Sequence, residues 1–239
     1  MDIVYIVGAD TRHDYVELKY SIRSMQKHLD NIGKLVIVGT MPAFVQDAIH
    51  IPAGDPHKHN DARNIYEKIL AACSDPRVGK KSLYCSDDYF LHRDFSSETF
   101  PCFYEGDIIT VNKRVSATGT YKPYVESTLR VLQEKNLPLK YFNVHCPIIY
   151  DKDLFNEIMP AFDWSVRFGY ISKSLYCNAL KIEGVPFGGL EKIGTPKTKT
   201  AIARRIDGMP FFSTNHHAIN AEMKETLEEL YPVKSKWET

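Results

Sequence analysis

Short apolar runs alternate with amphipathic stretches along the first half of the chain. The runs "IVYIVGA" and "KLVIVGT" are almost wholly apolar, which is typical of strands buried on both faces. The stretches between them repeat their apolar residues every three or four positions, the period of a helix with one buried face. We therefore predict strands at 3–9, 34–40, 48–52 and 82–86, and helices at 14–29 and 60–73.

Both predicted helices have residues that suit a helix start. Asp14 and Glu17 fit an aspartate version of the capping box, and Asn60 or Asp61 suits the N-cap of the second helix. One apolar face of the first helix is formed by Leu18, Ile22, Met25 and Leu29, and one of the second by Ile65, Ile69, Leu70 and Cys73.

The second half of the chain is less regular. "DIITV" predicts a strand at 107–111, and "CPIIYDKDLFNEIM" predicts a strand and then a helix capped near Asp151. Further helices are predicted at 122–136, 171–184 and 218–231. The basic segment 192–205 is taken as a solvated loop, with a lid over phosphates or a contact to a polyanion as the functional alternatives.

The order of strands and helices indicates an α/β fold with a mostly parallel central sheet flanked by helices. Nothing in the sequence marks a linker, so residues 1–239 are predicted to form one domain. Ligands of such sheets bind beyond the carboxyl ends of the strands. The segments that follow 3–9 and 82–86 are therefore the first places to look for a site.

Composition narrows the class of protein. The 239 residues include 30 basic and 30 acidic ones, so no overall field recruits nucleic acid or an anionic membrane. We expect no transmembrane segment and no signal peptide, because no apolar run is long enough and the start lacks a basic region. The five cysteines are widely spaced without a CxxC pair, which favours reduced thiols and a cytoplasmic protein.

The chemistry centres on Asp87 and Asp88, which directly follow the predicted strand at 82–86. A solvated turn would explain adjacent carboxylates. Their place at the ligand edge of the sheet, with "YFL" after them, favours a divalent cation instead. Two hard oxygen ligands suit Mn²⁺ or Mg²⁺, which would neutralise the diphosphate leaving from a nucleotide sugar.

The motif "SDDYFL" resembles the aspartate signature of GT-A-fold glycosyltransferases. The chain further resembles the stealth family of sugar-phosphate transferases through "DIVYIVGAD", "ELKYSIRSMQKH", "KLVIVGTMPAFVQD", "ARNIYEKI" and "HCPIIYDKDLFNEIMPAF". Two positions depart from the family pattern. Ser86 stands where asparagine usually precedes the acids, and His216 stands where an acid would follow Asn215. The resemblance therefore leaves sugar transfer and sugar-1-phosphate transfer both open.

The resemblance implies that residues 1–95 bind the nucleotide sugar and residues 96–239 form the acceptor side. The end of the first strand would hold the base and ribose, and arginine or a helix N-terminus would contact phosphate. A strand-to-helix turn, a surface ion pair and a helix cap are the structural alternatives. The candidate donor-binding residues are Val7, Gly8, Asp10, Arg23, Arg63 and Asn64.

Catalytic candidates lie in the second half. His145 and Arg167 fall at family-marked positions, as an acid/base or phosphate partner and as a group that stabilises developing charge. Asp163 is a further candidate base for the acceptor hydroxyl. His216 is a candidate third metal ligand, although "STNHH" also suits a helix N-cap.

The sequence thus predicts a metal-dependent glycosyltransferase that uses a nucleotide-diphosphate sugar, with a UDP-sugar the expected donor. The acceptor would carry a hydroxyl group, as in a glycan, a lipid-linked sugar or a hydroxymethylated base of modified DNA. Two alternatives stay open at this point: a stealth-type sugar-1-phosphate transferase, and a nucleotide-sugar-binding protein without turnover.

Overall fold

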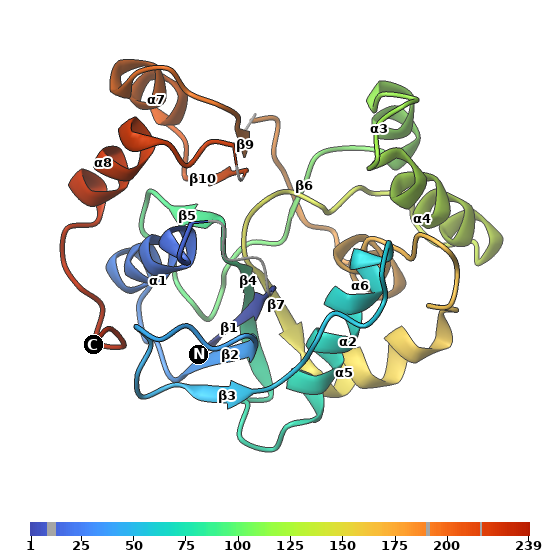
Figure 1. Cartoon of the computed structure of the whole chain (residues 1–239). Coiled ribbons are helices and arrows are strands. Elements are labelled where there is room, and N and C mark those ends of the chain that lie inside the picture. Colours follow the sequence, from blue (N-terminus) through green and yellow to red (C-terminus); the bar gives the residue numbers. More distant parts are fainter. Residues whose placement is uncertain (9–12, 190–191, 216) are drawn as a thin grey trace.

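A five-stranded sheet organises the chain in the computed structural model, which describes residues 1–8, 13–189, 192–215 and 217–239 (Figure 1). The strand order is β3-β2-β1-β4-β7. The first four strands in this order run parallel, and β7 pairs antiparallel with β4. The strands are β1 (Asp2–Val7), β2 (Leu35–Gly39), β3 (Ile49–Ile51), β4 (Lys81–Ser86) and β7 (Ile148–Asp151). The predicted mostly parallel α/β sheet is confirmed.

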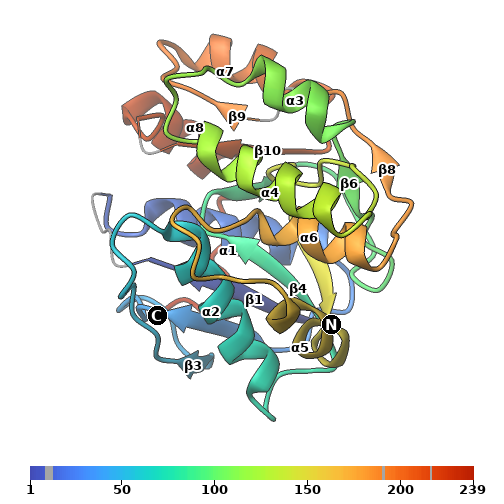
Figure 2. The same ribbon diagram turned by 90° about the vertical axis from the view of Figure 1, so that its right-hand side faces the viewer.

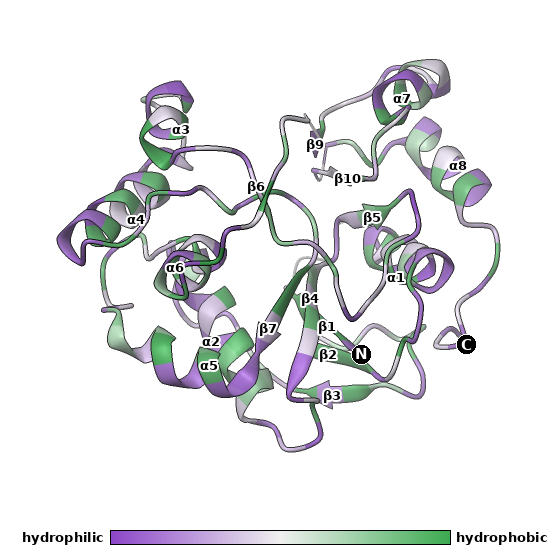
Figure 3. Ribbon diagram, turned by 180° about the vertical axis from the view of Figure 1, so that it is seen from behind, coloured by the Kyte–Doolittle hydropathy of each residue, from purple (hydrophilic) through white to green (hydrophobic). Residues whose placement is uncertain are grey.

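Alternating residues of the central strands face two separate layers of helix. Val4 and Val36 pack in a cluster with α2 (Asp61–Ser74), whereas Ile3 and Leu35 pack in a cluster with α1 (Val16–His28). Successive side chains of a strand point to opposite faces, so these helices cover opposite faces of the sheet. This double cover explains why the central strands are mostly apolar (Figure 3).

A second, smaller sheet begins directly after the acidic pair. Its order is β5 (Tyr89–Leu91), β10 (Phe211–Thr214) and β9 (Lys192–Ile193). Residues from α7 (Lys199–Ile206) and α8 (Ala221–Leu230) form one apolar cluster with Phe90 and Phe212 of this sheet. The last part of the chain therefore returns to the segment that carries Asp87 and Asp88.

The middle of the chain lies on the opposite side from α7 and α8, as Figures 1 and 2 show. Here α4 and α6 pack with α2 and α5 in the larger apolar cluster. The elements are β6 (Phe103–Tyr104), α3 (Ile108–Arg114), α4 (Lys122–Glu134), α5 (Lys152–Ile158), the 3₁₀ turn η1 (Met159–Ala161), α6 (Ser172–Ala179) and β8 (Val185–Pro186).

Two predicted segments were wrong. The run at 107–111 is not a strand but the start of α3, where the Asp107 carboxylate accepts a hydrogen bond from the Ile109 N–H at 2.7 Å. The basic segment 192–205 is not a loop, because it forms β9 and α7. Thr198 caps α7, and Ile202 and Ile206 are buried.

The predicted caps were right for two helices and wrong for one. Asn60 caps α2 and Asp151 caps α5 through their side chains. The capping box of α1 does not form, because Tyr15 is the N-cap residue and makes no side-chain cap. Glu17 instead accepts a hydrogen bond from the Thr214 hydroxyl at 2.7 Å.

All five cysteines carry free thiols. Among the described residues, no helix combines the length and the apolar character needed to cross a bilayer.

A buried ion pair attaches the C-terminal segment to α1. The Arg23 guanidinium donates to both carboxylate oxygens of Glu238 at 2.9 Å, and both side chains are almost inaccessible. Arg23 also donates to the Tyr231 carbonyl at 3.0 Å. Burial pushes the pKa of Glu238 upward, but the hydrogen bonds from Arg23 outweigh it and leave the pKa below its ordinary value.

We predict that Glu238→Gln lowers the free energy of unfolding by about 3 kcal/mol at neutral pH, since it removes the buried counter-charge of Arg23 and leaves only a longer contact to the exposed Glu228 at 3.4 Å. The depressed pKa means that the ionised carboxylate stabilises the fold above pH 4.5, its ordinary pKa, and less as the pH falls below that. Denaturant titrations at several pH values should therefore show the two proteins converging in acid. Glu134→Gln is the control, because Glu134 is exposed and pairs with Arg130 at 4.0 Å. If Glu238→Gln and Glu134→Gln lower the free energy of unfolding equally at neutral pH, the prediction is wrong.

Gly39 ends β2 in a backbone conformation with φ +117°, and a Cβ at this position would lie 2.0 Å from the Val7 carbonyl oxygen. We predict that Gly39→Ala costs more than about 2 kcal/mol through backbone strain and this contact. Gly54→Ala is the matched control, since nothing lies within 4 Å of its added Cβ. Its effect should stay within about 0.5 kcal/mol. Equal midpoints for both variants in thermal melts would disprove the claim.

Candidate active site

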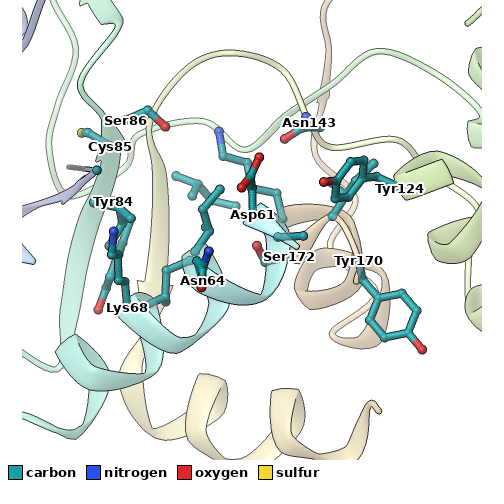
Figure 4. Close-up of a pocket in the computed structure, with 18 of the residues that line it drawn as sticks. Asp61, Asn64, Lys68, Tyr84, Cys85, Ser86, Tyr124, Asn143, Tyr170 and Ser172 are labelled. Atoms are coloured by element: carbon teal, nitrogen blue, oxygen red, sulfur yellow. The ribbon is translucent and has the colours of Figure 1, made fainter. Parts of the chain in front are cut away.

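A cavity of about 760 Å³ opens beyond the carboxyl ends of β1 and β4. This volume is in the range of small-molecule sites. Gly8 and Asp87 line it from the sheet, and Asn64 and Lys68 line it from α2. The opposite wall comes from the segment before α4 and from the start of α6, including Tyr121 and Ser172. Figure 4 shows this arrangement, with Asn64 and Lys68 on one helix and Ser172 on another.

The end of β1 is held by a lysine that crosses from α2. The Lys68 ammonium donates to the Val7 carbonyl at 3.0 Å and to the Asp55 carboxylate at 2.6 Å. The ion pair neutralises a side chain that is almost wholly buried. The Val7 side chain is buried, so its backbone alone takes part at this edge, while Gly8 lines the cavity itself.

Asn64 lies in the cavity wall and shapes the loop above it. Its side-chain amide accepts from the His57 N–H at 3.0 Å and donates to the His57 carbonyl at 3.2 Å. This closes the loop between β3 and α2 around one asparagine. A ligand in the cavity would meet the remaining polar edge of that amide.

The predicted acidic pair lies at this end of the sheet, and Asp87 lines the cavity. Both carboxylates are half-buried. Burial and then the charge of Asp87 raise the pKa of Asp88 to about 8, with Glu17 adding to the effect and Lys192 opposing it. The Asp88 carbonyl also accepts from the Thr214 N–H at 3.3 Å, so β10 fixes this turn.

The acidic pair fits a divalent cation in its chemistry. Hard carboxylate oxygens suit Mn²⁺ or Mg²⁺, and a cation would offset the burial and the repulsion by Asp87 that raise the pKa of Asp88. Among the described residues, no group of three or more His, Cys, Asp or Glu side chains is arranged to hold a metal ion. The predicted third ligand, His216, lies outside the described residues, as does the predicted ribose contact Asp10.

His145 lies next to this turn, with its ring 6.0 Å from that of Tyr89 in an edge-on contact. Burial, and then the charges of Lys192 and Lys173, lower the pKa of His145 to about 3. The imidazole is therefore neutral at physiological pH. A base with so low a pKa accepts protons weakly.

Both arginines predicted to contact the donor are engaged elsewhere. Arg23 is enclosed with Glu238, as described above, and contributes to stability instead of lining the cavity. Arg63 pairs with Glu67 at 2.9 Å one turn along α2. For Arg23 the alternative left open by the sequence was a surface ion pair, whereas its pair with Glu238 is buried. The pair between Arg63 and Glu67 was not among the alternatives.

Asp163 and Arg167 lie on the exposed segment between η1 and α6, outside the cavity lining. The Asp163 carboxylate accepts from the Ser165 N–H at 2.9 Å and from its hydroxyl, and these bonds lower the pKa of Asp163. Arg167 lies over the ring of its neighbour Phe168, 5.0 Å from the centroid. Neither side chain is directed to the acidic pair by any contact in the structure.

Sequence reasoning missed several polar residues of the cavity. Lys68 had a signal, since it lies one turn after Asn64 on the same helical face. Lys173 had none, because only the fold brings the start of α6 to this wall. The same holds for Tyr121, whose hydroxyl accepts from the Asn143 amide at 2.6 Å.

We predict that Asp88→Asn stabilises the protein in the presence of a chelator by at least about 1 kcal/mol, the equivalent of one pKa unit. The change removes a charge that burial and Asp87 both disfavour. Asp153→Asn is the control, since Asp153 is exposed and forms only a surface pair with Lys80. Thermal and chemical denaturation measure the difference. A less stable Asp88→Asn protein would show that the acidic pair is not under repulsion.

No protein-family model and no curated protein match the chain. Solved structures do match it. A complex of the galactosyltransferase LgtC with donor and acceptor sugar analogues shares 13% identity and a TM-score of 0.52, over 99% of this chain and 97% of that one. An active-site mutant of LgtC shares 12% sequence identity and a TM-score of 0.53, over 99% of each chain. Apo WbbM, a bifunctional glycosyltransferase, shares 12% sequence identity and a TM-score of 0.52 with this protein. The match covers 98% of this chain and 50% of the WbbM chain. At such identities the likeness shows the fold, which is that of the GT-A-like glycosyltransferases.

Proposed function

We propose that this protein is a divalent-cation-dependent glycosyltransferase, with a nucleotide-diphosphate sugar as donor and a hydroxyl group as acceptor. One observation carries the proposal: a half-buried Asp87–Asp88 pair beside a large cavity, at the end of β4 in a GT-A-like fold. A UDP-sugar is the expected donor. The stealth family stays a prediction from the sequence motifs.

The proposed donor-binding residues lie at the end of β1, on α2 and at the acidic turn after β4. Gly8 lets a nucleotide approach the end of β1 without a side chain in the way. Asn64 and the loop it closes would contact the base or ribose. Asp87 and Asp88 would hold Mn²⁺ or Mg²⁺, with His216 the proposed third ligand. A bound cation of this kind supplies charge neutralisation of the leaving diphosphate.

The acceptor side lies toward α4 and α6. Tyr121 and Asn143 present a hydroxyl and an amide to the cavity, groups that hydrogen-bond a sugar or a base. His145 stays the proposed proton or phosphate partner because its ring contacts that of Tyr89, the residue after Asp88. Asp163 and Arg167 would need a different arrangement of their segment.

A thermal-shift screen of nucleotide sugars tests the donor class. The matching donor should raise the melting temperature by mass action, and more so with Mn²⁺ than with a chelator. Asp88→Asn should lose the Mn²⁺-dependent part and lower turnover at least 100-fold, a loss typical of removing a main electrostatic contribution. Asp153→Asn should behave as wild type. If no nucleotide sugar stabilises the wild type under either condition, the proposal is wrong.

The released nucleotide separates the candidate reactions. A nucleoside diphosphate means glycosyl transfer, and a nucleoside monophosphate means the sugar-1-phosphate transfer that the stealth resemblance implies. Chromatography of the products with the donor found in the screen distinguishes them. Donor binding without release of either nucleotide, with a range of acceptors, would indicate a binding protein without turnover.

A further inference from the structure

Lys173 lies in the first turn of α6 and lines the cavity. Its ammonium donates to the Val144 carbonyl at 3.0 Å and to the Cys146 carbonyl, and it lies 4.7 Å above the Tyr89 ring. The Tyr89 hydroxyl is a longer contact at 3.4 Å. Two short bonds to carbonyl oxygens therefore fix the position of this charge, and the third N–H is only weakly engaged.

The partners of Lys173 are all neutral. The cavity's other lysine, Lys68, has a carboxylate at 2.6 Å. Within the described ranges, no carboxylate lies within ion-pair distance of Lys173. A partly buried ammonium is costly unless an opposite charge compensates it. The cavity wall thus contains a positioned cation for which the described residues supply no carboxylate counter-charge.

The surroundings of Lys173 suit an oxyanion. The Ser172 hydroxyl lines the same cavity, and the N-cap residue of α6, Ile171, makes no side-chain cap. The positive end of the helix dipole adds to the field of the lysine. The residues that interact electrostatically with Lys173 include Cys85 and Tyr89, which lie on either side of the segment that carries the acidic pair.

We propose that Lys173 binds a phosphate oxygen of the donor's diphosphate, from the wall that faces the end of β1. Its ammonium would give the leaving group a second positive charge besides a cation on Asp87 and Asp88. Nucleotide diphosphate binding should therefore persist, weakened, when the divalent cation is removed. This inference rests on the proposed function and adds a charge that neither the motifs nor the acidic pair reveal.

Isothermal titration calorimetry in excess EDTA tests the proposal by measuring the affinities for UDP and for uridine. The wild type should bind UDP at least tenfold more tightly than uridine. Lys173→Met should lose that difference and keep its affinity for uridine, because only the phosphates contact Lys173. Lys173→Arg should restore much of it, since the charge remains. Lys152→Met is the control: Lys152 likewise donates to a backbone carbonyl, that of Val78 at 3.0 Å, but does not line the cavity.

The outcomes separate this inference from the proposed function. If Lys173→Met keeps the wild-type preference for UDP, or the wild type shows none, the inference is wrong even where nucleotide sugars bind with Mn²⁺. If no nucleotide binds at all, the proposed function fails, and inorganic pyrophosphate replaces UDP as the probe. Pyrophosphate binding that is equal in Lys173→Met and Lys152→Met then overturns the inference, and a selective loss supports it. Melting temperatures and the Lys173→Arg variant exclude misfolding as the cause of a loss.

Discussion

The charge of two adjacent carboxylates, held half-buried at the end of a central strand, is the constraint on which the proposed chemistry depends. β4 is paired on both sides within the sheet, and β10 bonds the backbone of Asp88 immediately afterwards. These bonds hold the backbone of the acidic turn at the end of β4, where Asp87 lines the cavity. Burial and mutual repulsion raise the pKa of Asp88, and Glu17 makes the region still more negative. A cation and a phosphate together would satisfy this part of the structure.

The fold surrounds this acidic turn with lysines that have different roles. Lys68 is neutralised by Asp55 and holds the end of β1, so it shapes the cavity and carries little free charge toward a ligand. Lys192 acts on Asp88 from the second sheet. On the far wall, the Lys173 ammonium is bonded to backbone carbonyls and has no carboxylate partner in the part of the chain that the structure describes. A ligand in the cavity would therefore lie between the negative charge of the acidic turn on one wall and the positive charge of Lys173 on the other.

Sequence patterns predicted the architecture well where burial was regular. The parallel strands and α1 and α2 follow from continuous apolar runs and from a helical repeat, because packing on the sheet requires those patterns. Prediction failed for two short helices away from the central sheet, α3 and α7. The β-branched run at 107–111 favoured a strand, yet the Asp107 cap and burial of one face made it α3. The basic residues of 199–206 masked a helix that packs in one apolar cluster with α8 and the small sheet.

By itself, the sequence determined the sheet, the position of Asp87 and Asp88 at a strand end, and the presence of a polar edge there. These features depend on residues close together in the chain, and local periodicity records them. Tertiary structure alone decided which charged side chains can reach a ligand in the cavity. Arg23 is enclosed by Glu238, more than two hundred positions away, whereas Lys173 reaches the cavity and is bonded there to backbone carbonyls. Pairing between distant side chains depends on how the layers pack, and no local pattern in the sequence records it.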